Sequence, residues 1–169
     1  QAGEWFSKAA AKEHKYALYS LGMLYLQGKG VEQDEETAYS LLFRSYSKGN
    51  PYAAYELGKL YETGCGTEKN QEKSENCYRA AFLGFLNLEK RSKDDTIWYR
   101  IGCMYLHGIG TEADETKAEH YLTKASDYGN THASYQLARL YIRQESQKLS
   151  GESGTAPDYA KIAKAVKWL

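Results

Sequence analysis

The chain lacks a net charge, a long apolar run and an even number of cysteines. Its 169 residues include 22 Lys and Arg against 22 Asp and Glu, so no overall field draws it to nucleic acid or to an anionic membrane. No apolar run approaches the roughly 18 residues of a membrane-spanning helix, and the opening residues show no signal-peptide pattern. With 42% apolar and 26% charged residues, the composition is that of an ordinary globular protein.

The cysteines are few and irregularly placed. Cys65, Cys77 and Cys103 stand 12 and 26 residues apart, and an odd number at such spacings does not predict a disulfide framework. We therefore expect free thiols in a reducing compartment, taken as the cytoplasm. A secreted protein is the alternative.

In their place the sequence carries a repeated pattern of tyrosine and glycine, Tyr-x-x-Gly-x-x-Tyr-x-x-Gly-x-Gly. It occurs at residues 19–30, 55–66 and 99–110 and, in degraded form, at 135–141. The central residues Gly22, Gly58, Gly102 and Ala138 lie 36, 44 and 36 residues apart. A period of this size marks a solenoid of stacked helix pairs, in which each pair buries its apolar face against its neighbours. The predicted fold is therefore all-α.

The first helix of each pair, helix A, is expected to bury one face. Apolar residues stand five before, one before and two after each central residue: Ala17, Leu21, Leu24; Ala53, Leu57, Leu60; Ile97, Ile101, Met104; Ala133, Leu137, Leu140. Spacings of four and three place them on one helical stripe. A second face sets the small central residue between two tyrosines, which predicts the close approach of a neighbouring helix and a packing role for half of the 16 tyrosines.

Glycine and capping residues divide each pair. The Gly-x-Gly elements are expected to end helix A, because glycine adopts the left-handed conformation of a helix C-terminus. The second helix, helix B, is expected to start at Asp34, Asn70 and Asp114, which are good N-caps. The eight extra residues of the longer interval fall around residues 83–95 and predict a longer helix B. Residues 144–157, rich in Ser and Gly, predict a flexible loop.

These motifs resemble the Sel-one-like repeat (SLR) family, relatives of the tetratricopeptide repeat. The likeness rests on Ala-x-Tyr-x-Leu-Gly-x-x-Tyr-x-x-Gly-x-Gly followed by an acidic cap, and it covers nearly the whole chain. It implies a right-handed αα superhelix that acts as an adaptor or scaffold. Residues 82–95 are in addition similar to a segment in SLR tails of bacterial conjugative mobilisation proteins (relaxases).

The repeat register predicts a fragment of a longer solenoid. Trp5-Phe6 precedes Gly22 by the 17 residues that separate Tyr121-Leu122 from Ala138, so residues 1–15 are expected to be half a unit. Four units follow, at about residues 16–50, 51–94, 95–130 and 131–169, within one solenoid domain. Residues 165–169 repeat the register of residues 2–6.

Reactive chemistry finds little support in the sequence. The Gly-rich turns follow a helix and lack the Lys-Ser/Thr end of a P-loop, which favours helix caps over phosphate binding. Cys103 and His107 share a helix face and His132 opens the next unit, but a zinc site needs three or four converging ligands. No histidine lies in a triad or nucleophile motif. We expect no catalytic residue, metal or other cofactor, and no small-molecule substrate.

One remaining stripe of helix A varies from unit to unit, unlike the packing columns. It takes positions six and two before and one and five after the central residue, and helix A commonly lines the concave groove of such solenoids. The predicted partner-binding residues are Tyr16, Ser20, Met23, Gln27, Tyr52, Glu56, Lys59, Thr63, Arg100, His107, His132, Gln136, Arg139 and Arg143. The alternative is a merely solvated face.

The last two units make this stripe basic, with Arg100, Arg139 and Arg143 and no carboxylate. An acidic segment or a carboxylate terminus of another protein would suit it. The sequence thus predicts a protein–protein interaction module without catalysis of its own. The alternatives are a docking or regulatory tail of a larger enzyme, such as a relaxase, and a nucleic-acid-binding solenoid.

Overall fold

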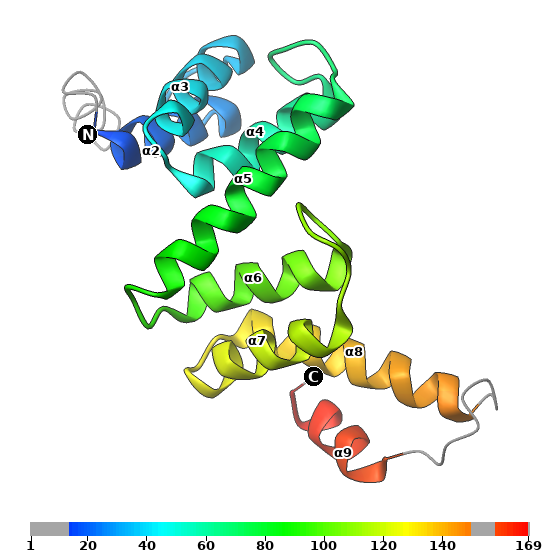
Figure 1. The fold of residues 1–169 in the computed structure, drawn as a ribbon. Helices are drawn as coiled ribbons and strands as arrows, with labels where there is room; N and C mark the ends of the chain where they lie inside the picture. Colours follow the sequence, from blue (N-terminus) through cyan, green and yellow to red (C-terminus); the bar gives the residue numbers. More distant parts are fainter. Residues whose placement is uncertain (1–13, 150–157, 169) are drawn as a thin grey trace. The chain divides into compact units, whose positions relative to one another are not determined.

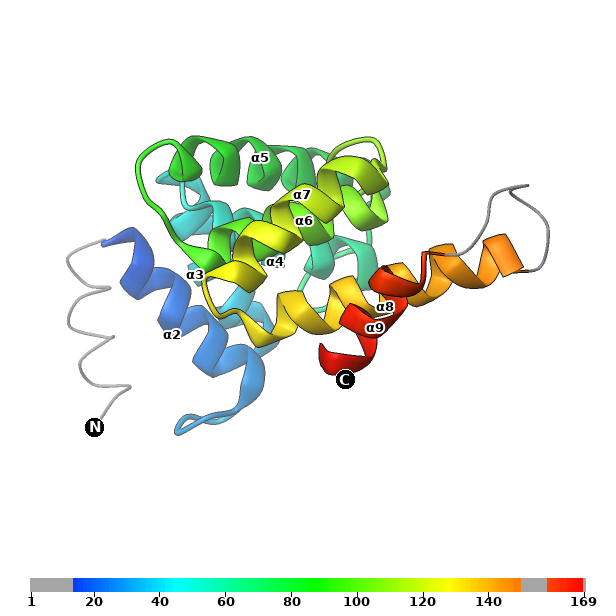
Figure 2. The same ribbon diagram turned by 90° about the horizontal axis from the view of Figure 1, so that it is seen from below.

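The computed structural model describes residues 14–149 and 158–168, with side chains described to residues 148 and 163 of these segments. All regular structure within these segments is α-helical (Figures 1 and 2). The helices are α2 (Lys15–Gln27), α3 (Glu35–Ser47), α4 (Pro51–Thr63), α5 (Gln71–Glu89), α6 (Asp95–His107), α7 (Glu115–Asp127), α8 (Thr131–Leu149) and α9 (Tyr159–Trp168). The all-α class of paired solenoid helices is confirmed. The predicted half unit, apart from Lys15 and His14, lies outside the described residues, as do the side chains of 165–169.

The chain divides into two compact units, called unit 1 and unit 2, which are larger than the repeat units of the sequence. Unit 1 comprises Gln1–Asn87 and Ile109–Thr111, and unit 2 comprises Leu88–Gly108 and Glu112–Leu169. In unit 1, α3 packs against both α2 and α4. In unit 2, α7 packs against α6 and α8, and α8 packs against α9. Helices A and B therefore alternate within each unit, as the repeat predicts.

The packing columns form the cores of both units. Leu57 and Leu60 pack with Leu42 and Cys77 in unit 1, and Leu137 packs with Leu122 in unit 2. Every residue of the three predicted columns is buried except Leu24, which is half-buried. The packing columns predicted from 3.6-residue periodicity thus form the apolar face whose burial drives folding.

The central glycines make room for helix B of the same pair. A Cβ atom at Gly22 would lie 3.0 Å from Cγ of Leu42, and one at Gly102 would lie 2.8 Å from Cγ of Leu122. The close helix approach predicted from the tyrosine–glycine face is confirmed at these positions.

The tyrosines of this face are mostly half-buried or buried. The Tyr61 hydroxyl lies 2.7 Å from the Tyr39 hydroxyl, and Tyr141 donates to Glu119 at 3.0 Å. The packing role predicted for Tyr135 is wrong, since that side chain is 48% exposed. Tyr19 and Tyr99 each meet the first residues of the next helix A, whereas no further helix A follows Tyr135 among the described residues.

The caps lie where the sequence places them. Gly28, Gly64 and Gly108 end α2, α4 and α6 with φ of 63°, 81° and 68°. The side chains of Asp34, Asn70 and Asp114 each accept a hydrogen bond of 2.9 Å from the amide three residues on, at Thr37, Lys73 and Lys117. Each cap satisfies an amide that the first helical turn leaves without a partner.

The two irregular segments differ in outcome. Helix α5 has 19 residues where α3 and α7 have 13, so the lengthened helix B is confirmed. The loop predicted at residues 144–157 is wrong for Gln144–Leu149, which continue α8. Residues 150–157 lie outside the described residues.

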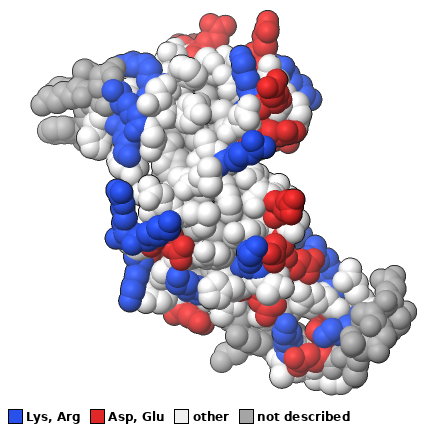
Figure 3. Space-filling model, in the orientation of Figure 1, with Lys and Arg blue, Asp and Glu red and all other residues white. Residues whose placement is uncertain are grey.

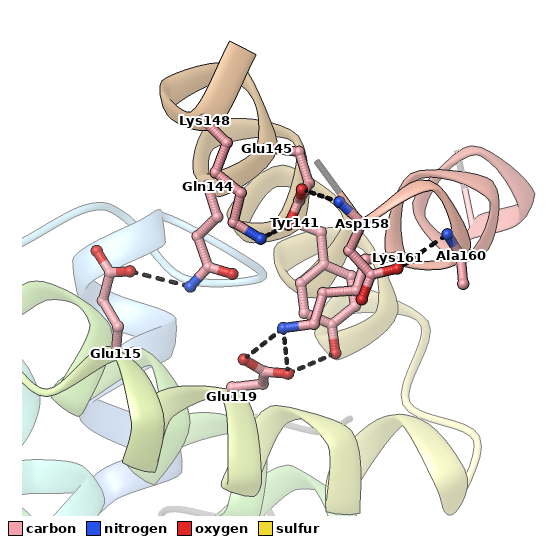
Figure 4. A network of polar contacts seen from close by, with 9 residues as sticks. All are labelled: Glu115, Glu119, Tyr141, Gln144, Glu145, Lys148, Asp158, Ala160 and Lys161. Atoms are coloured by element: carbon pink, nitrogen blue, oxygen red, sulfur yellow. Dashed lines mark hydrogen bonds and ion pairs between the residues drawn. The ribbon is translucent and has the colours of Figure 1, made fainter. Parts of the chain in front are cut away.

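A buried carboxylate lies in the part of α8 that the sequence predicts as loop (Figure 4). Glu145 is 1% exposed, and its side chain accepts from Lys148 at 2.7 Å and from the amide of Asp158 at the start of α9. One turn further along α9, Lys161 donates to Glu119 of α7 at 3.2 Å. These contacts tie α9 to α8 and α7 within unit 2.

Candidate functional site

The predicted stripe is only partly accessible in unit 1. Tyr16, Gln27, Lys59 and Thr63 are exposed, and Ser20 is half-buried. Met23 packs against the core around Leu42 and Leu57. This half of the stripe therefore combines exposed polar and aromatic side chains with others that pack on the core.

Two further stripe residues of unit 1 serve the structure itself. Glu56 is 7% exposed, and its carboxylate accepts from Lys59 at 2.8 Å. The Tyr52 ring meets the Phe85 ring edge-on, with centroids 5.0 Å apart. A partner would therefore touch little of Glu56, whereas Tyr52 is half-buried.

Unit 2 brings four of the predicted residues together around one pocket. The pocket has a volume of about 160 Å³ and is lined by Leu106, His107, Gln136, Arg139, Leu140 and Arg143. α6 supplies the first two residues, and α8 supplies the other four. The two leucines give the pocket an apolar part, and the polar residues surround it with hydrogen-bond donors. His132 lies apart from the pocket at the start of α8, exposed, with its ring 6.0 Å from the Tyr99 ring.

The arginines of the stripe have different surroundings. Arg139 is exposed and its guanidinium carbon lies 5.9 Å from the centre of the Tyr135 ring. Arg100 is half-buried. Arg143 pairs with the Glu115 carboxylate of α7, and both side chains are 50% exposed. The basic part of the stripe therefore has a carboxylate beside it, that of Glu115 in α7.

Three lining or contacting residues were missed from the sequence. Leu140 belongs to a predicted packing column and Leu106 to none of the predicted columns, yet both line the pocket. Glu115 is the first residue of α7, and only the packing of α7 against α8 brings it to Arg143.

A larger hollow in unit 1 has the opposite charge. It measures about 890 Å³ and is lined by Tyr39, Thr67, two glycines and the carboxylates of Asp34, Glu35, Glu36 and Glu68. An acidic partner would be repelled here. The two units therefore offer surfaces of different electrostatic character.

The thiols show no sign of reactive or metal-binding chemistry. Burial raises the pKa of Cys77 and Cys103, and burial together with Glu35 raises the pKa of Cys65. A raised pKa leaves little thiolate at neutral pH. No group of three or more His, Cys, Asp or Glu side chains within residues 14–149 and 158–168 converges as metal ligands would.

No helix in the described part of the chain has both the length and the apolar character needed to cross a membrane.

Comparison with known proteins agrees with this architecture. The Sel1 repeat family model matches residues 1–14, 15–50, 51–83 and 99–130. Among curated proteins no significant match was found. A solved Sel1 repeat protein from Oxalobacter formigenes is 25% identical, with a TM-score of 0.59 over 98% of this chain and 60% of that one.

Two further solved structures are more distant. A protective antigen with an SLR fold from uropathogenic Escherichia coli is 21% identical, with a TM-score of 0.49 over 98% of this chain and 39% of that one. An immunity protein from Pseudomonas aeruginosa is 22% identical, with a TM-score of 0.42 over 98% of this chain and 71% of that one. The repeat matches cover most of the sequence, and the chain belongs to the Sel1 repeat family.

Proposed function

We propose that this chain is a protein-interaction module that takes an acidic segment of a partner at the pocket between α6 and α8. Sel1 repeat proteins are generally protein-interaction scaffolds. The clustering of His107, Arg139 and Arg143 around one pocket supports the proposal that this pocket takes an acidic segment. Arg100 and His132 also belong to the predicted stripe of unit 2, and they lie in the same two helices, α6 and α8.

The size of the pocket favours a side chain over a small molecule. Sites for drug-sized ligands usually measure about 300–1,000 Å³, whereas this pocket holds about 160 Å³. A glutamate side chain or a terminal carboxylate fits that volume. Its methylenes would contact Leu106 and Leu140. Its carboxylate would accept hydrogen bonds from an arginine, whose planar guanidinium can donate two of them to one carboxylate.

The pairing of Arg143 with Glu115 does not block this site. Both side chains are half exposed, and such surface pairs contribute only about 0–1 kcal/mol. A carboxylate held in place by the rest of a bound segment would displace Glu115 at little cost.

The proposal is tested with a fluorescein-labelled glutamate decapeptide that ends in a free carboxylate. Fluorescence anisotropy at low salt should detect binding, and Arg139→Glu combined with Arg143→Glu should weaken it by about tenfold or more, since close charge pairs at interfaces control affinity. A matched control reverses Lys29 and Lys69, two exposed loop residues of unit 1. Equal affinities of the arginine variant and the control would refute the site.

A further inference from the structure

The turn between α5 and α6 carries a second concentration of positive charge, within unit 2. Lys90, Arg91 and Lys93 are exposed there, and none of their side chains has a hydrogen-bond or ion-pair partner among the described residues. Figure 3 shows Lys and Arg side chains gathered beside this turn. No residue of the predicted stripe belongs to it.

The carboxylates next to these cations are all engaged elsewhere. Glu89 accepts from Lys124 at 2.8 Å and from Tyr121 at 3.2 Å. Asp94 caps α6 by accepting from the amides of Thr96 and Ile97, and Asp95 accepts from Asn130 at 2.8 Å. The three cations of the turn therefore keep their hydrogen-bond donors for an external ligand.

Glu89 remains ionised in this setting. Burial raises its pKa, but the hydrogen bond and positive charge of Lys124 outweigh burial, so that the pKa of Glu89 lies below its ordinary value. The Glu89 carboxylate forms an ion pair with Lys124, whose Nζ atom also lies 4.3 Å from the centre of the Trp98 ring. Lys124 is thus a structural cation, distinct from the three of the turn.

An aromatic side chain borders the same surface. A hollow of about 500 Å³ is lined by residues 89–93 together with Trp98, Lys124 and Tyr128. Trp98 is 2% exposed and supports Tyr128 edge-on, with ring centroids 4.8 Å apart, while Tyr128 itself is 58% exposed. An exposed tyrosine held in place by a buried ring is the type of residue that anchors protein interfaces.

We infer that this surface, defined by Lys90, Arg91, Lys93 and Tyr128 and named here the basic turn, binds a segment of a partner protein in which acidic residues flank an apolar side chain. The carboxylates would meet the three cations, and the apolar side chain would pack on the Tyr128 ring. The inference rests on the proposed function only in that the ligand is a protein.

A protein segment fits the observations better than nucleic acid does. Nucleic-acid-binding domains carry basic residues along an extended face and are strongly basic as a whole, whereas this chain has 22 basic and 22 acidic residues. The basic turn is a single local patch beside an aromatic anchor, which matches the composition of protein interfaces.

The test uses the whole chain in the Arg139→Glu/Arg143→Glu background, so that the pocket between α6 and α8 cannot bind the probe. The probe is a fluorescein-labelled decapeptide with one phenylalanine among glutamates, followed by anisotropy at low salt. Adding Lys90→Glu, Arg91→Glu and Lys93→Glu should weaken binding by about tenfold or more. The matched control adds Lys29→Glu, Lys69→Glu and Arg79→Glu, which lie in unit 1, and should change affinity less than about twofold.

A second comparison tests the aromatic contact. Replacing the phenylalanine of the probe by serine should weaken binding, and Tyr128→Ala should remove that difference between the two probes. Circular dichroism confirms that each variant is folded. Retained binding in the basic-turn variant overturns the inference. Failure of the probe to bind the background protein overturns it as well. Neither result bears on the proposal for the pocket between α6 and α8. Tighter binding of a deoxythymidine decamer that is lost in the basic-turn variant overturns it in favour of nucleic acid.

Discussion

Gly58 lies against the ring of Tyr78: a Cβ atom at residue 58 would come within 2.6 Å of the Cδ1 and Cε1 atoms of Tyr78. The glycine belongs to α4 and the tyrosine to α5, so the missing side chain lets this helix pair close. The Tyr78 hydroxyl donates to Glu62, one turn further along α4, at 2.7 Å. Ring and hydroxyl together fix the contact between the two helices.

A side chain at Gly58 should therefore destabilise unit 1. We expect Gly58→Leu to lower the free energy of unfolding by about 1–3 kcal/mol, because overpacking forces neighbouring side chains and backbone to shift. Urea denaturation followed by circular dichroism measures the change. Ser40→Leu, at an exposed position of α3, is the control and should cost much less. Combining Gly58→Leu with Tyr78→Ala should recover part of the loss, and strictly additive losses would contradict the steric explanation.

Gly102 offers an independent test in unit 2. Its would-be Cβ meets Leu122, which is fully buried, and also the backbone nitrogen of Leu122 at 3.2 Å. Because backbone moves less readily than a side chain, Gly102→Leu should destabilise by at least as much as Gly58→Leu. The same urea denaturation experiment measures this loss, and an unchanged free energy of unfolding would show that α6 and α7 can separate without cost.

The buried Glu145 should make the attachment of α9 sensitive to acid. Hydrogen bonds from Lys148 and from the amide of Asp158 hold the pKa of Glu145 below its ordinary value of 4.5. A lowered pKa in the folded state means that the carboxylate stabilises the fold above its ordinary pKa, and that this stability is lost as pH falls through the folded-state pKa. Protection of the α9 amides from hydrogen exchange, taken relative to the intrinsic exchange rate at each pH, should therefore fall below about pH 4.5.

Replacement of Glu145 by glutamine provides the matched control. Glu145→Gln keeps the shape of the side chain but removes its titration. The α9 amides should therefore be less protected from exchange at neutral pH, and their protection should depend less on pH. If wild type and variant show the same pH profile, another group controls the attachment of α9.

The thiols provide a third kind of test. Because burial raises the pKa of Cys77 and Cys103, both should react slowly with a thiol reagent in the native protein at pH 7. All three cysteines should react after unfolding without prior reduction, and metal analysis should detect no stoichiometric zinc. One zinc per chain, or one reactive thiol after unfolding, would revive the metal or disulfide interpretation of Cys103.

Local rules predicted the parts of this fold that depend on residues near in sequence. Glycine at φ of 63–81° ends α2, α4 and α6, and Asp34 and Asp114 begin α3 and α7, because caps need only the adjoining turn. The same holds for the packing columns, whose period is that of the helix. Such features follow from sequence spacing alone.

Features that depend on a neighbouring helix were not predictable in this way. The stripe containing Glu56 and Arg143 reads as one polar face, yet Glu56 is buried and Arg143 meets Glu115 of another helix. A helical wheel identifies which residues share a face but not what packs against it. The loop predicted at residues 144–157 is wrong at residues 144–149 for a similar reason, since a partner of Glu145 is the amide of Asp158, 13 residues away.

Removing the carboxylate that competes for Arg143 should strengthen binding of an acidic segment. In the wild type, Glu115 pairs with Arg143 and also accepts from Gln144 at 3.1 Å, so a partner must displace it. Glu115→Gln keeps the side-chain shape and the exposed position but removes the charge. We expect it to raise the affinity for the glutamate decapeptide by about threefold to fivefold, the range of a surface ion pair of roughly 1 kcal/mol.

The gain should depend on Arg143 and on ionic strength. In the Arg143→Met background the Glu115→Gln change should have much less effect, because the pair it releases is absent. Salt should weaken binding in every variant, since charge pairs at the surface are screened over roughly 8 Å at physiological ionic strength. Glu119→Gln, in the same helix, is a poor control because Glu119 binds Lys161 and Tyr141, so Glu112→Gln serves as the neutralisation at an exposed position. If Glu112→Gln raises affinity as much as Glu115→Gln, the gain comes from net charge alone, and Arg143 is not the residue that receives the carboxylate.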